Sequence, residues 1–192
     1  MYAIMKMKFA NGARRLLKPA CVSRFWRRDD GAAAVEFALV VLPFLALMFA
    51  IIQTALVFFA QQTLETVTAN TARQVLTGQA QNAGYSQTTF KQLVCNQFVV
   101  ALFNCITGLS VDVRTYTSFG SIDSTLPPYQ NGTFTTVYQP GNPGDIVVVR
   151  LLYAWPMFVN LLGDDIANFG NNSRLLIATA AFRNEPYTPT GP

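Results

Sequence analysis

The sequence predicts an α+β protein in which a long N-terminal helix, membrane-spanning in its first half, packs on a small antiparallel β-sheet. Three observations predict this class. A nearly uncharged apolar run covers residues 32–60, an amphipathic run follows over residues 61–77, and strand-like runs fill the C-terminal half. The composition agrees, because only 12% of the residues are charged, whereas soluble domains carry about a quarter.

The apolar run from Ala32 to Ala60 contains one charged residue, Glu36. A helix needs about 20 apolar residues to cross a bilayer, so this run is long enough. A buried core helix is the alternative, but a helix that is apolar on every face would be unusual in so small a domain. We therefore predict one transmembrane helix.

Eight basic residues and no acidic residue lie in residues 1–28, and this asymmetry predicts the orientation of the helix. Cations are retained on the cytoplasmic side of a membrane, so the N-terminus stays in the cytoplasm and the C-terminus crosses. From residue 32 onward six basic and eight acidic residues give 6 − 8 = −2. The basic pI therefore belongs to a short arm, and nucleic acid is not an expected partner.

The chain has no histidine, which removes the commonest general base and metal ligand. An enzyme tethered in the envelope would need a Ser/Lys or carboxylate centre. Lys91 is the only lysine after the basic arm, and no Ser-x-x-Lys precedes it. We therefore predict a non-enzymatic protein with no catalytic residue, no metal ligand and no cofactor.

The junction of arm and apolar run, residues 27–37, reads RRDDGAAAVEF. Here the chain resembles the type IV prepilin class, and specifically the TadE-like family of the Tad (tight adherence) pilus system. The resemblance implies that a membrane peptidase cuts on the cytoplasmic face between Gly31 and Ala32. Glu36 then becomes the fifth residue of the mature chain, and Phe37 follows it as an aromatic residue does in Tad prepilins.

Glu36 also has a physical reading beside this resemblance. A carboxylate within an apolar helix costs about 2.5–3.5 kcal/mol on insertion scales, and cleavage would create an α-ammonium at Ala32 in the same layer. Glu36 of one subunit could pair with that ammonium on a neighbour and fix the axial register. Alternatively, Glu36 snorkels to the headgroups. Glycine at position 31 would let the backbone approach a peptidase closely.

Pro43 interrupts the apolar run, and proline inside a helix removes a hydrogen bond and kinks the axis. Membrane helices tolerate this when neighbours satisfy the freed carbonyl. Pro43 could mark a functional bend or local melting of the helix, or it could be a tolerated kink.

The helix is expected to continue through residues 61–77 and to stop near Gly78, and a second helix is expected over Gln87–Phe103. Cys95 and Cys105 frame the change from helix to strand. A disulfide needs Cα atoms within about 7 Å, so the chain would turn back after about Phe103. In an oxidising periplasm this pair should bridge, and two buried free thiols are the alternative.

Four strand-like runs follow the cysteines. The run Asp145–Trp155 is the strongest, and its continuous apolar stretch predicts a central strand. The connections between runs fit an antiparallel sheet beside the long helix, which is the general plan of pilins. The other three runs are Leu109–Phe119, Thr133–Tyr138 and Arg174–Arg183.

The predicted organisation is a basic cytoplasmic leader (1–31), a transmembrane helix (32–60), a helix extension (61–78) and an exported α+β domain (79–192). The resemblance implies a minor pilin or pseudopilin of a Tad-type (type IVc) adhesive pilus, since major Tad pilins are much shorter. Its partners would be the prepilin peptidase, other pilins and the inner-membrane assembly platform. The alternative is an uncleaved single-pass signal-anchor protein whose periplasmic domain binds a partner.

Overall fold

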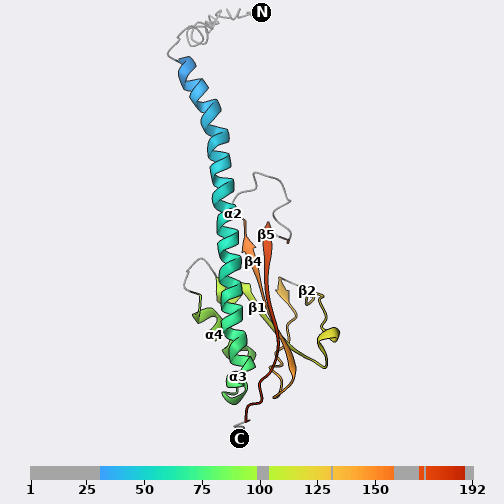
Figure 1. Cartoon of the computed structure of the whole chain (residues 1–192). Helices are drawn as coiled ribbons and strands as arrows, with labels where there is room; N and C mark the ends of the chain where they lie inside the picture. Colours follow the sequence, from blue (N-terminus) through green and yellow to red (C-terminus); the bar gives the residue numbers. More distant parts are fainter. Residues whose placement is uncertain (1–30, 99–103, 131, 158–168, 171, 189–192) are drawn as a thin grey trace, which may run out of the picture. The chain divides into compact units, whose positions relative to one another are not determined.

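A computed structural model of the chain describes residues 31–98, 104–130, 132–157, 169–170 and 172–188 (Figure 1). The predicted leader before Gly31 lies outside these residues. The helical elements are α2 (Ala32–Leu76), α3 (Gln79–Asn82), α4 (Gln87–Asn96), α5 (Cys105–Gly108) and the 3₁₀ turn η2 (Phe119–Ser121). The strands are β1 (Leu109–Tyr116), β2 (Tyr129–Gln130), β3 (Thr133–Phe134), β4 (Ile146–Pro156) and β5 (Ser173–Arg183).

The long helix α2 begins and ends close to its predicted bounds. The chain divides into two compact units at Ala46 and Leu47, so α2 contributes helix to both units. It ends before Gly78, whose φ of 76° is the left-handed conformation that glycine adopts most readily. The ring of Tyr187 lies where a Cβ at Gly78 would be, so the stop signal is also a packing site.

A three-stranded antiparallel sheet of order β1-β4-β5 forms the centre of the second unit. Strand β4 is the central strand, as its continuous apolar run predicted. It pairs with β1 from Leu109–Tyr153 to Tyr116–Ile146 and with β5 over its full length. The α+β class, with a long N-terminal helix on a small antiparallel sheet, is thereby confirmed.

The hydrophobic core lies between α2 and one face of this sheet. Side chains alternate between the two faces of a strand, and the odd-numbered positions of β1 and β4 face the helix. The helix contributes a buried stripe at spacings of three and four, which is the pattern of an amphipathic helix. The stripe includes Val57, Ala60, Leu64, Val67, Thr68, Thr71, Ala72 and Val75.

The second helix is shorter than the predicted Gln87–Phe103. Ser86 caps the N-terminus of α4 by accepting a hydrogen bond from the Thr89 N–H at 3.2 Å, and the helix ends at Asn96. Phe98 is partly buried against the core from outside the helix, and residues 99–103 lie outside the described part. At Phe98 the apolar spacing therefore reflects packing beyond the helix end.

Two of the predicted strands are also shorter. The first ends at Tyr116, and Phe119 lies in the turn η2 instead. Of the run Thr133–Tyr138 only its first two residues pair, with β2 in a separate two-stranded sheet, while Tyr138 forms an isolated parallel bridge to Val113. The β-branched residues of this run therefore do not form a full strand, and the end of the run pairs with the outer edge of β1 instead.

Candidate functional site

The residues of the predicted processing site lie at the beginning of α2. Gly31 stands immediately before the helix, and a Cβ built on it would have no atom of the described residues within 4 Å. Its φ is not in the left-handed region. Nothing in the described chain therefore requires glycine at this position.

Glu36 and Phe37 lie in the second turn of α2 and are both exposed. Phe37 exposes 69% of its surface. Glu36 has no hydrogen-bond or ion-pair partner among the described residues. Ala32 and Glu36 are four residues apart, which places them on the same face of the helix. The arrangement presents an unpaired carboxylate one turn from the residue that cleavage would make N-terminal.

Pro43 lies within α2, which continues without a break from Ala32 to Leu76. Proline cannot donate to the carbonyl of residue i−4, so the Leu39 carbonyl lacks its usual helical donor. A functional bend or melting at Pro43 remains a prediction.

Cys95 and Cys105 form a disulfide with their Cα atoms 5.6 Å apart. The bridge joins the last turn of α4 to the first residue of α5. The predicted pairing is confirmed, and the predicted turning point near Phe103 lies outside the described residues.

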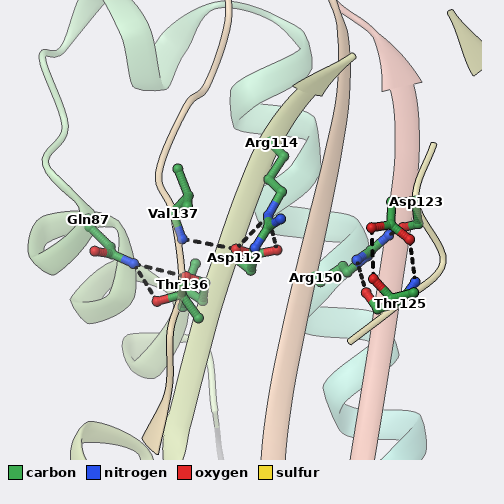
Figure 2. A network of polar contacts seen from close by, with 9 residues as sticks. Gln87, Asp112, Arg114, Asp123, Thr125, Thr136, Val137 and Arg150 are labelled. Atoms are coloured by element: carbon green, nitrogen blue, oxygen red, sulfur yellow. Dashed lines mark hydrogen bonds and ion pairs between the residues drawn. The ribbon is translucent and has the colours of Figure 1, made fainter. Parts of the chain in front are cut away.

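A polar network lies on the sheet face that points away from α2 (Figure 2). Asp112 of β1 is only 1% exposed. Its carboxylate accepts from the Arg114 Nε at 2.9 Å and from the Val137 N–H at 2.9 Å. Beside it, the Gln87 amide donates to the Val111 carbonyl at 3.0 Å. These bonds hold α4 and the segment around Val137 against the edge of β1.

Arg150 of β4 lies directly opposite Asp112 in the sheet and is 6% exposed. Its guanidinium donates to the backbone carbonyls of Asp123 and Thr125, at 3.0 Å in the latter case. The Asp123 carboxylate accepts two bonds from Thr125, from the N–H at 2.8 Å and the hydroxyl at 2.7 Å, and these lower the pKa of Asp123. Arg150 thus holds the connection between β1 and β4 against the sheet face that points away from α2.

Replacing Arg150 by methionine should loosen this connection. A hydrogen bond from a charged donor contributes about 1.5–3 kcal/mol, and two are lost, although the two carbonyls can be rehydrated. We expect faster chymotrypsin cleavage after Phe119 and Tyr129, which are 56% and 41% exposed. Arg73→Met removes an exposed arginine of α2 and is the matched control. Equal cleavage of both variants would show that Arg150 does not hold the connection.

Tyr138 supplies a test of the edge of β1. Its buried hydroxyl has no partner among the described residues, and its ring packs 5.4 Å from that of Phe90. Burial, with a smaller effect of Tyr85, raises the pKa of Tyr138 to about 12. The folded state therefore favours the neutral phenol, and stability falls as pH rises from about 10 towards 12.

The Tyr138→Phe variant should show a weaker alkaline fall in stability and no loss near neutral pH, because no hydrogen bond of the hydroxyl is removed. Urea unfolding of both proteins in the same detergent at pH 7 and pH 11 measures both effects. An alkaline fall as steep as that of the parent would contradict the assignment to Tyr138.

Sequence reasoning did not identify Asp112 or Arg150 as structural polar residues. The signal was present, since each interrupts an apolar strand pattern with a charge, at VDVR and VVVRLL. A charge within a buried strand needs partners. Arg114 lies two residues from Asp112, but the other partners lie 25–27 residues away in the chain, so their identity required the fold.

Comparison with known proteins bears on the N-terminal segment. Residues 31–73 match the family model described as TadE-like protein. The match begins at Gly31, covers α2 almost to its last turn and stops before the sheet. Among curated proteins and solved structures none matches the chain.

The same segment contains the one described helix that is long and apolar enough to cross a membrane, and its most apolar 18-residue window buries none of its residues. A TadE-like segment indicates a protein associated with a Tad pilus. The predicted resemblance is therefore confirmed over residues 31–73, and this part of the chain is TadE-like.

Proposed function

We propose that the chain is a minor pilin or pseudopilin of a Tad-type pilus, made as a precursor that a prepilin peptidase cuts between Gly31 and Ala32. The observation that carries this proposal is the placement of the TadE-like match. It begins at the residue before α2, and an unpaired carboxylate follows in the second turn of that helix.

The surroundings of Gly31 support cleavage there. A peptidase must bring the scissile backbone against its catalytic groups, and a residue without a Cβ permits the closest approach. Within the described part of the chain, a side chain at position 31 would meet no atom within 4 Å. A requirement for glycine at this position would therefore come from the peptidase.

The spacing of Ala32 and Glu36 supports a role in assembly. Residues four apart on a helix have their Cβ atoms about 5–6 Å from each other. A cut chain would carry a positive end and a negative side chain at that spacing on one face. A neighbouring parallel helix displaced by about one turn would place its ammonium beside Glu36. Both charges resist burial when unpaired, so pairing would select this register.

The proposed function also implies where each part of the chain lies. The basic leader keeps the N-terminus in the cytoplasm, α2 crosses the bacterial inner membrane and the disulfide-bearing domain lies in the periplasm. The partners are the prepilin peptidase, the other pilins of the system and the inner-membrane assembly platform. The protein would act in adhesion and biofilm formation through the fibre that it helps to assemble.

The mature N-terminus tests this proposal. Intact-mass and N-terminal peptide analysis of the protein from its native host should show a chain that starts at Ala32. A chain that starts at Met1 would contradict the proposal. It would instead support an uncleaved signal-anchor protein whose periplasmic domain binds an envelope partner.

A further inference from the structure

A cleft of about 580 Å³ lies at the corner of the sheet where β1 ends, β4 begins and β5 ends. This volume falls within the range of small-molecule sites, about 300–1,000 Å³. Residues 115–119 line one side of the cleft, and residues 144–146 and 183 line the other. All of them belong to the second compact unit, so the cleft is formed by that unit alone.

Three of the lining residues stand in one row across the sheet. Tyr116 of β1 is the cross-strand partner of Ile146 in β4, and Ile146 is the partner of Arg183 in β5. Cross-strand partners share a face of the sheet, and this row lies on the face away from α2. Neighbouring strands are about 4.7–4.9 Å apart, so a phenol and a guanidinium flank an apolar side chain across about 10 Å. Phe119, which is 56% exposed, adds a second ring to the cleft.

Arg183 is exposed, and one contact orients its guanidinium. Its Nε donates to the Gly144 carbonyl at 2.8 Å, while its two terminal nitrogens have no partner among the described residues. A guanidinium presents its donors in a planar fork that matches a carboxylate with two parallel bonds. Asp145, the acidic residue of the lining, accepts from the Asn142 N–H at 2.8 Å within its own turn. The cleft therefore offers an oriented cation to an incoming carboxylate.

The turns that border the cleft bond their main chain internally. The Gly144 N–H donates to the Asn184 carbonyl at 3.2 Å, and the Asp145 carbonyl accepts from the Asn184 N–H at 2.8 Å. Across the cleft, the Ser118 N–H and carbonyl both bond the Ser121 hydroxyl, at 3.2 and 2.8 Å. A peptide that adds to a sheet depends on free main-chain groups. Recognition in this cleft would therefore rest on side chains.

We propose that the cleft binds a saccharide residue that carries a carboxylate, that is, a uronic acid. The carboxylate pairs with the terminal nitrogens of Arg183, and the apolar face of the sugar ring packs on the ring of Phe119. The sugar hydroxyls bond the Tyr116 phenol and the Thr117 hydroxyl, which have no partner among the described residues. A neutral sugar would leave the guanidinium fork unused. The inference goes beyond the proposed function and does not rest on it.

Calorimetric titration of the full chain in detergent tests this inference. The probe is a tetrasaccharide of β-1,4-linked glucuronic acid, and the β-1,4-linked glucose tetrasaccharide is its neutral match. A short peptide with a free C-terminal carboxylate is the third ligand. We expect the acidic saccharide to bind at least about tenfold more tightly than either, because it alone uses both the guanidinium and the hydroxyls. No binding of the acidic saccharide, equal binding of the neutral one, or preference for the peptide would each refute the inference.

Variants of the lining assign the binding to this cleft. Arg183→Met and Phe119→Ser should each weaken binding of the acidic saccharide about tenfold or more. Arg183→Lys keeps the charge but loses the planar fork, so it should also bind more weakly. Arg174→Met is the matched control, because it removes the same charge nine residues away on β5, about 30 Å along the strand.

The control should bind as the parent does. The urea midpoint of each variant shows whether its domain remains folded, and Arg183→Lys decides the outcome if Arg183→Met is destabilised. Parent-like binding by both Phe119→Ser and Arg183→Lys would place the saccharide outside the cleft. An equal loss in Arg174→Met would assign the effect to net charge and would contradict the inference as well.

Discussion

The Gly31→Val precursor should stay uncut in a host that processes the parent chain. Valine adds a branched side chain next to the bond between residues 31 and 32 and so obstructs the approach of a peptidase to the backbone. We expect processing to slow at least about tenfold, which corresponds to about 1.4 kcal/mol in the barrier. A pulse-chase experiment read by gel shift and intact mass measures the rate.

The exported domain of this variant should fold as in the parent. No atom of the residues that the structure describes lies within 4 Å of a Cβ at Gly31, so the added side chain should not disturb the domain. Formation of the Cys95–Cys105 disulfide checks this. Ala34→Val is the matched control, because it adds the same side chain within the first turn of α2 and away from the bond. Normal processing of Gly31→Val would refute cleavage at this bond, whatever the control shows.

The parts of the fold that the sequence predicted well are those specified by long, uniform patterns. Helix α2 follows from its apolar run and its amphipathic continuation, and Gly78 ends it because a left-handed residue is needed there. The central position of β4 follows from a run of apolar residues too long for a strand with one wet face. Such patterns repeat over many residues, so tertiary context has little power to override them.

Short elements were predicted less well because few residues specify them. The apolar spacing of the sequence suits a helix beyond Asn96, yet α4 ends there, and a straight helix could not bring Cys95 and Cys105 within 5.6 Å. The β-branched run that begins at Thr133 forms only a two-residue strand, since Tyr138 pairs with Val113 at the edge of β1. In both places a distant partner decides a structure that local propensity leaves open.

The candidate site divides in the same way. The relative positions of Gly31, Ala32 and Glu36 could be predicted from the sequence, because residues at a fixed spacing along one helix lie at a fixed distance and angle from one another. The segment that covers the sheet face away from α2 could not be predicted. Arg150 binds this segment through the backbone carbonyls of Asp123 and Thr125, and these do not depend on the side chains there. Backbone acceptors are available at every residue, so no pattern of side chains identifies them.

The Glu36→Gln variant should be processed and inserted into the membrane but should fail to assemble into fibres. Glutamine keeps the shape of the side chain and removes the charge that would pair with the ammonium of a neighbouring Ala32. Insertion should not suffer, because a buried carboxylate opposes it by about 2.5–3.5 kcal/mol at the centre of a helix and less near its end. The substitution should therefore weaken only the association of subunits, because the ammonium of the neighbouring subunit is left without a partner.

Membrane fractionation, the mature mass and electron microscopy of surface fibres separate these effects. Glu65→Gln is the matched control, because Glu65 is an exposed glutamate of the same helix whose partners, Gln61 and Gln62, lie in its own chain. That variant should assemble normally. Normal fibres from Glu36→Gln would show that the carboxylate does not set the register, since an uncharged amide could not neutralise the new N-terminus. Loss of fibres from both variants would instead assign the effect to the surface charge of the helix, not to the pairing of Glu36.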